Sequence, residues 1–262
     1  AFAANSSVPS TLAGSLTRSR ASTTPSATAC AAVKALLAAA GEAATRHLDL
    51  DAIIAAATGG IAAEPFRPLS PPAERIALAQ DDAFSFVYPH LIAGWRAAGA
   101  TILPFSPLAD QAPDDSAGAC WLPGGYPELH GAALASSANF HAGLRAARDR
   151  DALIYGECGG FMVLGQGIVD KAGTAHAMSG LLPVTTRIDR PKRVLGYRRL
   201  LHESALPWPS GLNGHEFHYS SAKGSGLPPL FEALDAEGIR QPPMGAVLGR
   251  VMGSYAHVIC AP

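Results

Sequence analysis

The chain has 262 residues, of which 48% are hydrophobic and 16% are charged, and its formal net charge is −1. This length and apolar content suffice for a large buried core in one domain, or in one domain with an extension. The balance of 20 basic and 21 acidic residues excludes the strongly basic surface that binds nucleic acid or anionic lipid, and no apolar run is long enough to cross a membrane.

The N-terminal part of the chain has the composition of an extension rather than of a packed domain. Residues 1–27 are rich in Ser, Thr and Ala, and the chain begins at Ala1. This composition resembles that of a targeting segment, but we favour a disordered end or the remnant of a longer chain. Residues 28–57 predict one or two alanine-rich helices, and Asp49 is a candidate N-cap of the second one.

A linker is expected next. Residues 58–74 carry a Gly-Gly pair and several prolines, which are typical of loops. We therefore assign residues 1–74 to a disordered or helical extension with its linker, and residues 75–262 to the main domain.

The main domain alternates apolar runs with helical patterns. Strands are expected at 76–79, 100–104, 120–122 and 152–155, and helices at 89–98, 132–148 and 161–165. This alternation is typical of an α/β fold built from βαβ units around a parallel sheet. Short stretches bounded by Gly and Pro at 194–201, 215–220 and 246–251 predict antiparallel additions in the C-terminal part.

Residues 155–162, YGECGGFM, carry the strongest chemical signal. An apolar run ends in a turn of small residues with Cys158 at its apex, and a helix-capable segment follows. This is the layout of a nucleophile elbow with Cys in place of Ser. The glycines tolerate unusual backbone angles and leave the sulfur uncovered, and a nearby helix N-terminus favours the thiolate. Cys158 is therefore predicted to be a nucleophile; the alternative is a buried, inert thiol.

A nucleophilic thiol needs a base, and His257 is the best candidate among nine histidines. It lies in a strand-like stretch, 251–259, and a late residue of an α/β sheet can reach the carboxyl edge where catalytic groups collect. The alternative is a histidine satisfied within its strand. His215 and His218 are three residues apart, so on a strand they point to opposite faces, which argues against a shared metal ion. We predict no metal site, and structural or substrate-lining roles for these two.

The loop after the third expected strand is a candidate oxyanion hole. In 122–130, LPGGYPELH, the paired glycines can turn backbone N–H groups towards a pocket. The amides of Gly125 and Gly159 are the predicted donors, although the glycines alone would also fit a tight turn. Glu128 either lines the pocket or caps a helix, and Glu157 either tunes the thiol or bonds the turn. Neither receives a role, and the residues that bind the substrate stay unknown.

The four cysteines form no CxxC pair, and a chain of this size does not depend on disulfides. We therefore expect a reducing compartment, the cytoplasm. Cys30, Cys120 and Cys260 are interpreted as small buried hydrophobes, and the three tryptophans as packing residues.

Four motifs in one order resemble a known family: LPGGYPELH, YGECGGFMVLG, GHEFHYS and GSYAHVI. Together they are similar to the glutamine amidotransferase domain of the cobyrinate or hydrogenobyrinate a,c-diamide synthases, and the likeness runs almost continuously over 75–262. Residues 28–57 resemble, weakly, the tail of that family's N-terminal synthetase domain.

The resemblance implies a three-layer, flavodoxin-like parallel sheet flanked by helices, as in class I glutamine amidotransferases. It also implies that Cys158 attacks the side-chain amide of glutamine and that His257 activates the thiol. In the mechanism that we expect, the amides of Gly125 and Gly159 stabilise the oxyanion. Related class I enzymes carry a Glu two residues after the His, where this chain has Ile259. The resemblance therefore implies a Cys–His dyad and leaves open what orients the imidazole.

The same resemblance implies a partner for the second half-reaction. The family's synthetase domain uses a phosphate-binding loop, GxxxxGK[ST], to bind ATP with Mg²⁺, and this chain contains no such sequence. We expect the chain to have no cofactor of its own and to supply ammonia to a synthetase domain, in cis or in trans, that amidates the a and c carboxylates of a corrinoid. The alternatives are a truncated, non-catalytic relic or binding domain of the family, and an unrelated elbow-cysteine hydrolase.

Overall fold

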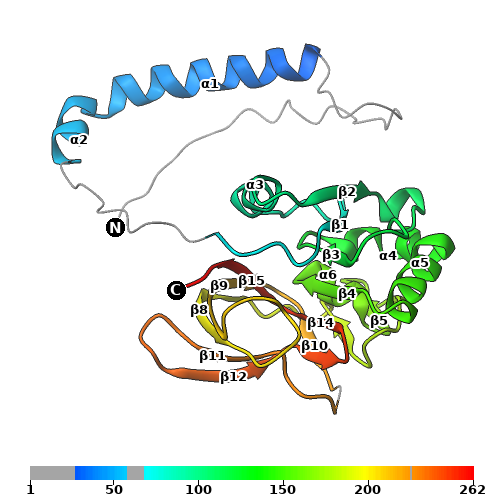
Figure 1. Cartoon of the computed structure of the whole chain (residues 1–262). Coiled ribbons are helices and arrows are strands. Elements are labelled where there is room, and N and C mark those ends of the chain that lie inside the picture. The colour runs from blue at the N-terminus through cyan, green and yellow to red at the C-terminus, as the bar shows by residue number, and fades with distance from the viewer. Residues whose placement is uncertain (1–26, 58–67, 225) are drawn as a thin grey trace. The chain divides into compact units, whose positions relative to one another are not determined.

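A computed structural model describes residues 27–57, 68–224 and 226–262 (Figure 1). The chain divides into two compact units, Ala1–Glu64 and Pro65–Pro262. The hypothesis of a disordered end or targeting segment for the first residues, and the first part of the expected linker, lie outside the described residues.

The described part of the first unit is helical, as expected. Helix α1 spans Ala27–His47 and helix α2 spans Leu50–Ala56. The Asp49 carboxylate accepts a hydrogen bond from the amide of Ala52 at 2.9 Å. Asp49 is therefore the N-cap of α2, because it satisfies an amide that has no partner within the helix.

The second unit is built on a six-stranded sheet with the order β13-β14-β4-β3-β1-β2 (Figure 1). The neighbours from β14 to β2 pair in parallel, and β13 joins the edge antiparallel. The strands are β1 (Arg75–Ala79), β2 (Thr101–Phe105), β3 (Ala119–Leu122), β4 (Leu153–Glu157), β13 (Ala246–Leu248) and β14 (Val251–Ser254). The four strands predicted before residue 160 and their parallel arrangement are confirmed.

Two smaller sheets follow in the C-terminal part. A four-stranded sheet has the order β10-β7-β5-β6, and a five-stranded antiparallel sheet has the order β12-β11-β8-β9-β15. Their strands are β5 (Gly167–Val169), β6 (Ala175–Ala177), β7 (Thr185–Arg187), β8 (Val194–Leu201), β9 (Gly211–His218), β10 (Ser221–Lys223), β11 (Phe231–Leu234), β12 (Arg240–Met244) and β15 (Ala256–Cys260).

The prediction that 246–251 is an antiparallel addition is wrong in part. Strand β13 does run antiparallel, but it extends the main sheet, and Val251 already begins the parallel strand β14. All four residues of β14 are buried, which is the environment of a strand covered on both faces. The predicted strand over 251–259 is likewise two strands in two different sheets, separated at Tyr255.

The helices of the second unit are α3 (Pro89–Ala97), α4 (Gly131–Ser136), α5 (Ala138–Asp149) and α6 (Gly159–Leu164), with two short 3₁₀ turns, η1 (Pro107–Ala109) and η2 (Pro127–His130). The single helix predicted over 132–148 is wrong, because the chain breaks at Ser137. The Ser137 hydroxyl donates to the carbonyl of Pro107 at 2.9 Å and contacts that of Ala133 at 3.0 Å, so its side chain bonds the backbone in place of a continuous helix.

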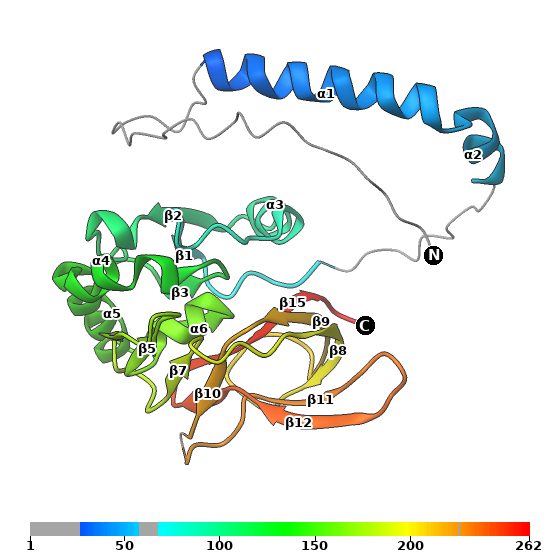
Figure 2. The same cartoon turned by 180° about the vertical axis from the view of Figure 1, so that it is seen from behind.

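The main sheet is covered on both faces, which gives three layers (Figures 1 and 2). One core packs alternate strand residues such as Leu122 and Ile154 against α4, α5 and α6. The other packs Trp121 and its neighbours against α3 and the five-stranded sheet. Part of the helical layer expected of a flavodoxin-like fold is thus replaced by antiparallel strands.

The tryptophans confirm their predicted packing role in this second core. Ring centroids of Trp95 and Trp121 lie 5.0 Å apart, and those of Trp121 and Trp208 lie 5.7 Å apart. Cys120 is buried as predicted, whereas Cys260 is only partly buried near the chain end. The side chain of Cys30 lies outside the described residues. Among the helices that the structure describes, none has the length and apolar character needed to span a bilayer.

Candidate active site

Cys158 occupies a strained turn between β4 and α6. Its backbone angles are φ 48° and ψ −105°, and a non-glycine residue adopts a positive φ at a cost of roughly 1–3 kcal/mol. The flanking glycines serve close packing: a Cβ on Gly156 would lie 2.7 Å from the backbone of Gly160, and a Cβ on Gly160 would collide with the carbonyl of Leu122. The elbow predicted from the sequence is present, with the strain on the cysteine itself.

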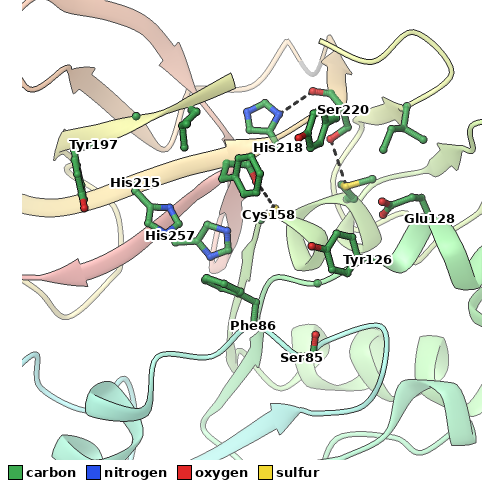
Figure 3. A pocket seen from close by; sticks show the side chains of 17 residues that line it. Ser85, Phe86, Tyr126, Glu128, Cys158, Tyr197, His215, His218, Ser220 and His257 are labelled. Carbon is green, nitrogen blue, oxygen red and sulfur yellow. Dashed lines mark hydrogen bonds between the residues drawn. The ribbon is translucent and has the colours of Figure 1, made fainter. Parts of the chain in front are cut away.

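The turn exposes Cys158 to a cavity of about 590 Å³ (Figure 3). The predicted residues Gly125 and His257 line the same cavity. Gly159 lies against Gly125, since a Cβ on Gly159 would be 3.1 Å from both the amide nitrogen and the carbonyl oxygen of Gly125. The structure therefore brings the predicted nucleophile, base and oxyanion donors together at one site.

Several chain segments contribute to the remaining wall of the cavity. The loop after β1 supplies Phe86, the loop after β3 supplies Glu128, and the five-stranded sheet supplies Tyr197 and His215. Tyr197 and His215 are paired across β8 and β9, and His215 and His257 are paired across β9 and β15. Cross-strand partners share a face of a sheet, so this face of the antiparallel sheet forms the wall opposite the elbow.

The His257 ring is held by packing. Its centroid lies 4.9 Å from that of Phe86 and 4.9 Å from that of His215. A Cβ on Gly124 would overlap the His257 ring, so Gly124 leaves the space that the imidazole fills. Sequence reasoning treated Gly124 only as part of the turn, because nothing local shows that a distant ring packs on it.

Glu157, for which the sequence predicted no role, lies beside the candidate base His257. Its Oε1 accepts hydrogen bonds from the amide of Val258 at 2.9 Å and from the hydroxyl of Tyr155 at 3.3 Å. Its Oε2 lies 3.8 Å from Nδ1 of His257, and both side chains are buried. The sequence carried one usable signal: residues alternate in direction along a strand, so a Glu next to an elbow cysteine that faces a pocket points away from that pocket into the interior, where it needs partners.

Burial sets the protonation of these groups. It raises the pKa of the Cys158 thiol to about 12, assisted by the negative charges of Glu128, Glu157 and Glu216. It lowers the pKa of His257 to about 3, with His215 contributing, and raises the pKa of Glu157 to about 8. At neutral pH the resting site therefore holds a thiol, a neutral imidazole and a largely protonated carboxyl.

This finding corrects the expectation that a helix N-terminus favours the thiolate of Cys158. Helix α6 has only six residues, and the desolvation of the sulfur outweighs the effect of its terminal amides. The nucleophile must therefore be generated by transfer of the thiol proton during the reaction.

His218 lines the cavity, where its Nδ1 contacts the carbonyl of Ser220 at 2.9 Å (Figure 3), and it belongs to a polar network. Its Nε2 lies 3.3 Å from Oε1 of Glu216, and Glu216 also pairs with Arg198 at 2.7 Å. The His218 ring stacks on Tyr255 with centroids 3.9 Å apart. His215 and His218 both line the cavity, which agrees with the lining alternative given for them but not with the expectation that they point to opposite sides of their strand. Within the described residues, no group of three or more His, Cys, Asp or Glu side chains is arranged to hold a metal ion.

Glu128, also without a predicted role, enters the cavity from η2. Its carboxylate has no ion-pair partner among the described residues, and burial raises its pKa. In Figure 3, Glu128 and His257 lie on opposite sides of Cys158. An unpaired carboxyl at this place can receive a cationic group of a bound molecule.

Comparisons with known proteins identify the family. Residues 75–262 match the CobB/CobQ-like glutamine amidotransferase domain. A hydrogenobyrinate a,c-diamide synthase from Rhodobacter capsulatus is 48% identical over 232 residues, covering 87% of this chain and 53% of the relative. Another from Mesorhizobium japonicum is 48% identical over 227 residues, covering 82% of this chain and 50% of the relative. The crystal structure of a glutamine amidotransferase from Thermotoga maritima has a TM-score of 0.46 and 14% identity, covering 70% of this chain and 74% of that one.

The chain spans about half the length of the curated relatives that it matches. The matched family segment contains the whole cavity wall described above, from the loop after β1 to His257 on β15. The resemblance found in the four sequence motifs is confirmed, and the chain belongs to the family of CobB/CobQ-like glutamine amidotransferase domains.

Proposed function

We propose that this chain is the glutamine-hydrolysing part of an amide-forming synthase and that it supplies ammonia for amidation of the a and c side-chain carboxylates of cobyrinate or hydrogenobyrinate. One observation carries the proposal: Cys158 at its strained elbow, His257 and Gly125 line one cavity, and Gly159 lies against the backbone of Gly125. The relatives named hydrogenobyrinate a,c-diamide synthase supply the acceptor.

The first half of the mechanism forms a thioester. The sulfur of Cys158 attacks the side-chain amide carbon of glutamine while the imidazole of His257 takes the thiol proton. The negative charge on the amide oxygen is stabilised by the amides of Gly125 and Gly159. His257 then gives its proton to the amide nitrogen, the C–N bond breaks, and ammonia leaves.

The second half regenerates the enzyme. His257 takes a proton from a water molecule, which attacks the thioester carbon, and the same two amides stabilise the second oxyanion. The C–S bond then breaks, the sulfur of Cys158 recovers the proton, and glutamate leaves. Because the resting thiol is neutral, the charged pair of thiolate and imidazolium forms only when a substrate is present to be attacked.

The other end of the substrate has a candidate partner in Glu128. Its carboxyl lines the cavity without an ion-pair partner among the described residues, and glutamine carries an α-ammonium group. We assign Glu128 to the recognition of that ammonium, which would hold the carboxylate in its ionised form.

The ATP-dependent half-reaction does not fit the residues present. The chain has no GxxxxGK[ST] sequence, and its described residues show no carboxylate group arranged for Mg²⁺. We therefore place activation of the corrinoid carboxylates on a synthetase domain, in cis or in trans, and derive no ATP step here. We place the protein in the cytoplasm, where a reducing environment keeps the Cys158 thiol free.

The test is to incubate the purified chain with glutamine, with and without a synthetase domain from a relative, and to measure glutamate and ammonia. Turnover that disappears in Cys158→Ala supports the proposal. Absence of turnover under both conditions identifies a non-catalytic member of the family. Cleavage of simple esters without cleavage of glutamine identifies a hydrolase of another class.

A further inference from the structure

We propose that Glu157 is the positioning acid of His257: its carboxylate receives the Nδ1–H of the imidazole and so leaves Nε2 free to take the thiol proton. The inference rests on the proposed function, in which His257 is the base. It concerns a carboxylate that immediately precedes the nucleophile in the chain, rather than one that follows the histidine.

The fold brings the two residues together through a change of sheet. Glu157 ends β4 and pairs in register with Ser254 of the parallel strand β14. The chain turns at Tyr255, enters β15 in the other sheet, and carries His257 back over the end of β4. Because the β4–β14 register fixes one residue and the β9–β15 register fixes the other, the pair does not depend on a flexible loop.

The two carboxylate oxygens of Glu157 make different contacts. Oε1 is occupied by the Val258 amide at 2.9 Å and by the Tyr155 hydroxyl at 3.3 Å, which fix the plane of the carboxyl beside the backbone of His257. Oε2 faces His257 Nδ1 at 3.8 Å and has no other partner among the described residues.

The atom that faces Oε2 of Glu157, Nδ1 of His257, also has no hydrogen-bond partner among the described residues. Nδ1 of His257 is buried and makes no hydrogen bond within the described part of the chain. The other ring neighbours, Phe86 and His215, contact the ring itself. Buried polar atoms are nearly always satisfied, and catalytic hydrogen bonds are often long in the absence of substrate. A shift of about 1 Å closes the gap to an ordinary hydrogen bond.

The contact selects the tautomer that catalysis needs. With Nδ1–H donated to an ionised Glu157, the lone pair of Nε2 is free for the Cys158 proton, and the imidazolium formed on attack faces a carboxylate. With a protonated Glu157, the acid hydrogen on Oε2 meets the lone pair of Nδ1, and the ring proton sits on Nε2, where it blocks the base. The active form is therefore the pair that has lost one proton.

This requirement predicts that activity increases as the pH becomes alkaline, which gives an alkaline limb in the pH profile. The pKa of Glu157 is raised to about 8 by burial, so kcat/KM for glutamine rises between neutral pH and pH 9. The groups that face the pair are Tyr155 on β4, Tyr88 before α3, His215 and His218 on β9, and Cys158 on the elbow. The pKa values of Tyr88 and Cys158 are about 12, that of Tyr155 is well above its ordinary value, and that of His215 is lowered by burial.

The first experiment reads the tautomer in the unmodified chain and needs no turnover; a variant serves only to assign the signal. In the full chain with ¹⁵N-labelled histidine, with His257 assigned by its absence in His257→Gln, nitrogen shifts at pH 9 report the tautomer. A protonated Nδ1 with a bare Nε2 supports the proposal. A protonated Nε2 with a bare Nδ1 overturns it, whether or not the chain hydrolyses glutamine.

The second experiment compares two isosteric substitutions. In Glu157→Gln the amide oxygen still accepts from Val258, but the amide N–H₂ points at Nδ1 and forces the wrong tautomer. We expect kcat to fall roughly 10²- to 10⁴-fold with little change in KM and with loss of the alkaline limb. The matched control is Glu216→Gln, which removes a carboxylate of similar burial that contacts His218 instead.

We expect Glu216→Gln to keep the rise of kcat/KM near pH 8 and to keep the His257 tautomer, although this variant loses the ion pair with Arg198. If Glu157→Gln keeps the kcat and the alkaline limb of the unmodified chain, the proposal is overturned. If that variant does not fold, the tautomer measured in the unmodified chain decides the question.

Discussion

The carbonyl of Ser254 accepts the amide hydrogen of Cys158 at 2.8 Å. This bond ties the strained apex of the elbow to the last residue of β14, three residues before the candidate base. A positive φ at a non-glycine residue persists only where surrounding contacts impose it, and the Ser254 contact is one of them. The nucleophile and the segment that carries its base are therefore fixed to each other through the main sheet.

The backbone strain at Cys158 is measurable. We expect Cys158→Gly to have a free energy of unfolding about 1 kcal/mol higher than that of Cys158→Ala, because glycine adopts a φ of 48° without steric cost. Urea denaturation of the two variants measures the difference. Equal stabilities would show that the elbow stores no strain.

The protonation state of the thiol gives a pH prediction. With the pKa of Cys158 raised to about 12 by burial, alkylation of Cys158 by iodoacetamide is slow at pH 7 and accelerates up to the highest pH at which the chain stays folded. Peptide mass spectrometry separates Cys158 from the other three cysteines. A rate at Cys158 that is already level between pH 6 and 8 would mean that a resting thiolate exists.

The same shift predicts a pH dependence of stability. The thiol pKa is higher in the folded chain than the ordinary value of 9.0. The stability that the protonated thiol contributes to the folded chain is therefore fully present below pH 9 and is lost as the pH rises towards 12. Above pH 9 the unmodified chain therefore loses free energy of unfolding relative to Cys158→Ala. Denaturation series at pH 7 and pH 10 measure it, and a constant difference would contradict the raised pKa.

Gly124 supplies a test of how closely the base is packed. Gly124→Ala places a methyl group in the space of the His257 ring, so the imidazole must move, and we expect kcat to fall roughly 10²-fold. The matched control is Gly211→Ala on β9, whose added Cβ has its nearest atom at the ordinary contact distance of 3.6 Å. If the two variants lose activity equally, the position of His257 is not what Gly124 protects.

Glu128 is tested by the substrate as well as by substitution. Glu128→Gln removes the charge offered to the α-ammonium of glutamine, and we expect KM to rise roughly 10- to 100-fold with a smaller change in kcat. Glutaramate, which has the side-chain amide but no α-amino group, should be a poor substrate of the unmodified chain. Its kcat/KM should be the same in the variant as in the unmodified chain. Equal losses on both substrates would place Glu128 elsewhere in the mechanism.

Local features of the sequence were sufficient for much of the fold. The first four strands of the main sheet along the chain, the Asp49 cap and the elbow at Cys158 depend on neighbouring residues, so their patterns are visible along the chain. The helix break at Ser137 was missed because the apolar period continues across it, while a hydroxyl bond to the distant Pro107 decides the outcome.

The site was only partly accessible from the sequence, for a related reason. His257 was proposed from its place in a late strand and supported by the resemblance to a family, but its contacts with Gly124 and Glu157 arise because β14 and β15 belong to different sheets. No local pattern marks that change of sheet. The thiolate expectation for Cys158 was wrong because a rule about helix ends says nothing of how deeply the sulfur is buried.

The central claim is that Cys158 carries a covalent glutamyl intermediate. The most direct measurement is intact-mass spectrometry of the chain after acid quenching of a reaction with glutamine, in the presence of a relative's synthetase domain, with peptide mapping of the adduct. The account predicts a glutamyl thioester on Cys158, one ammonia released for each glutamate, and neither in Cys158→Ala. Glutamine hydrolysis that persists in Cys158→Ala, or a chain that forms no adduct and releases no ammonia, would contradict it.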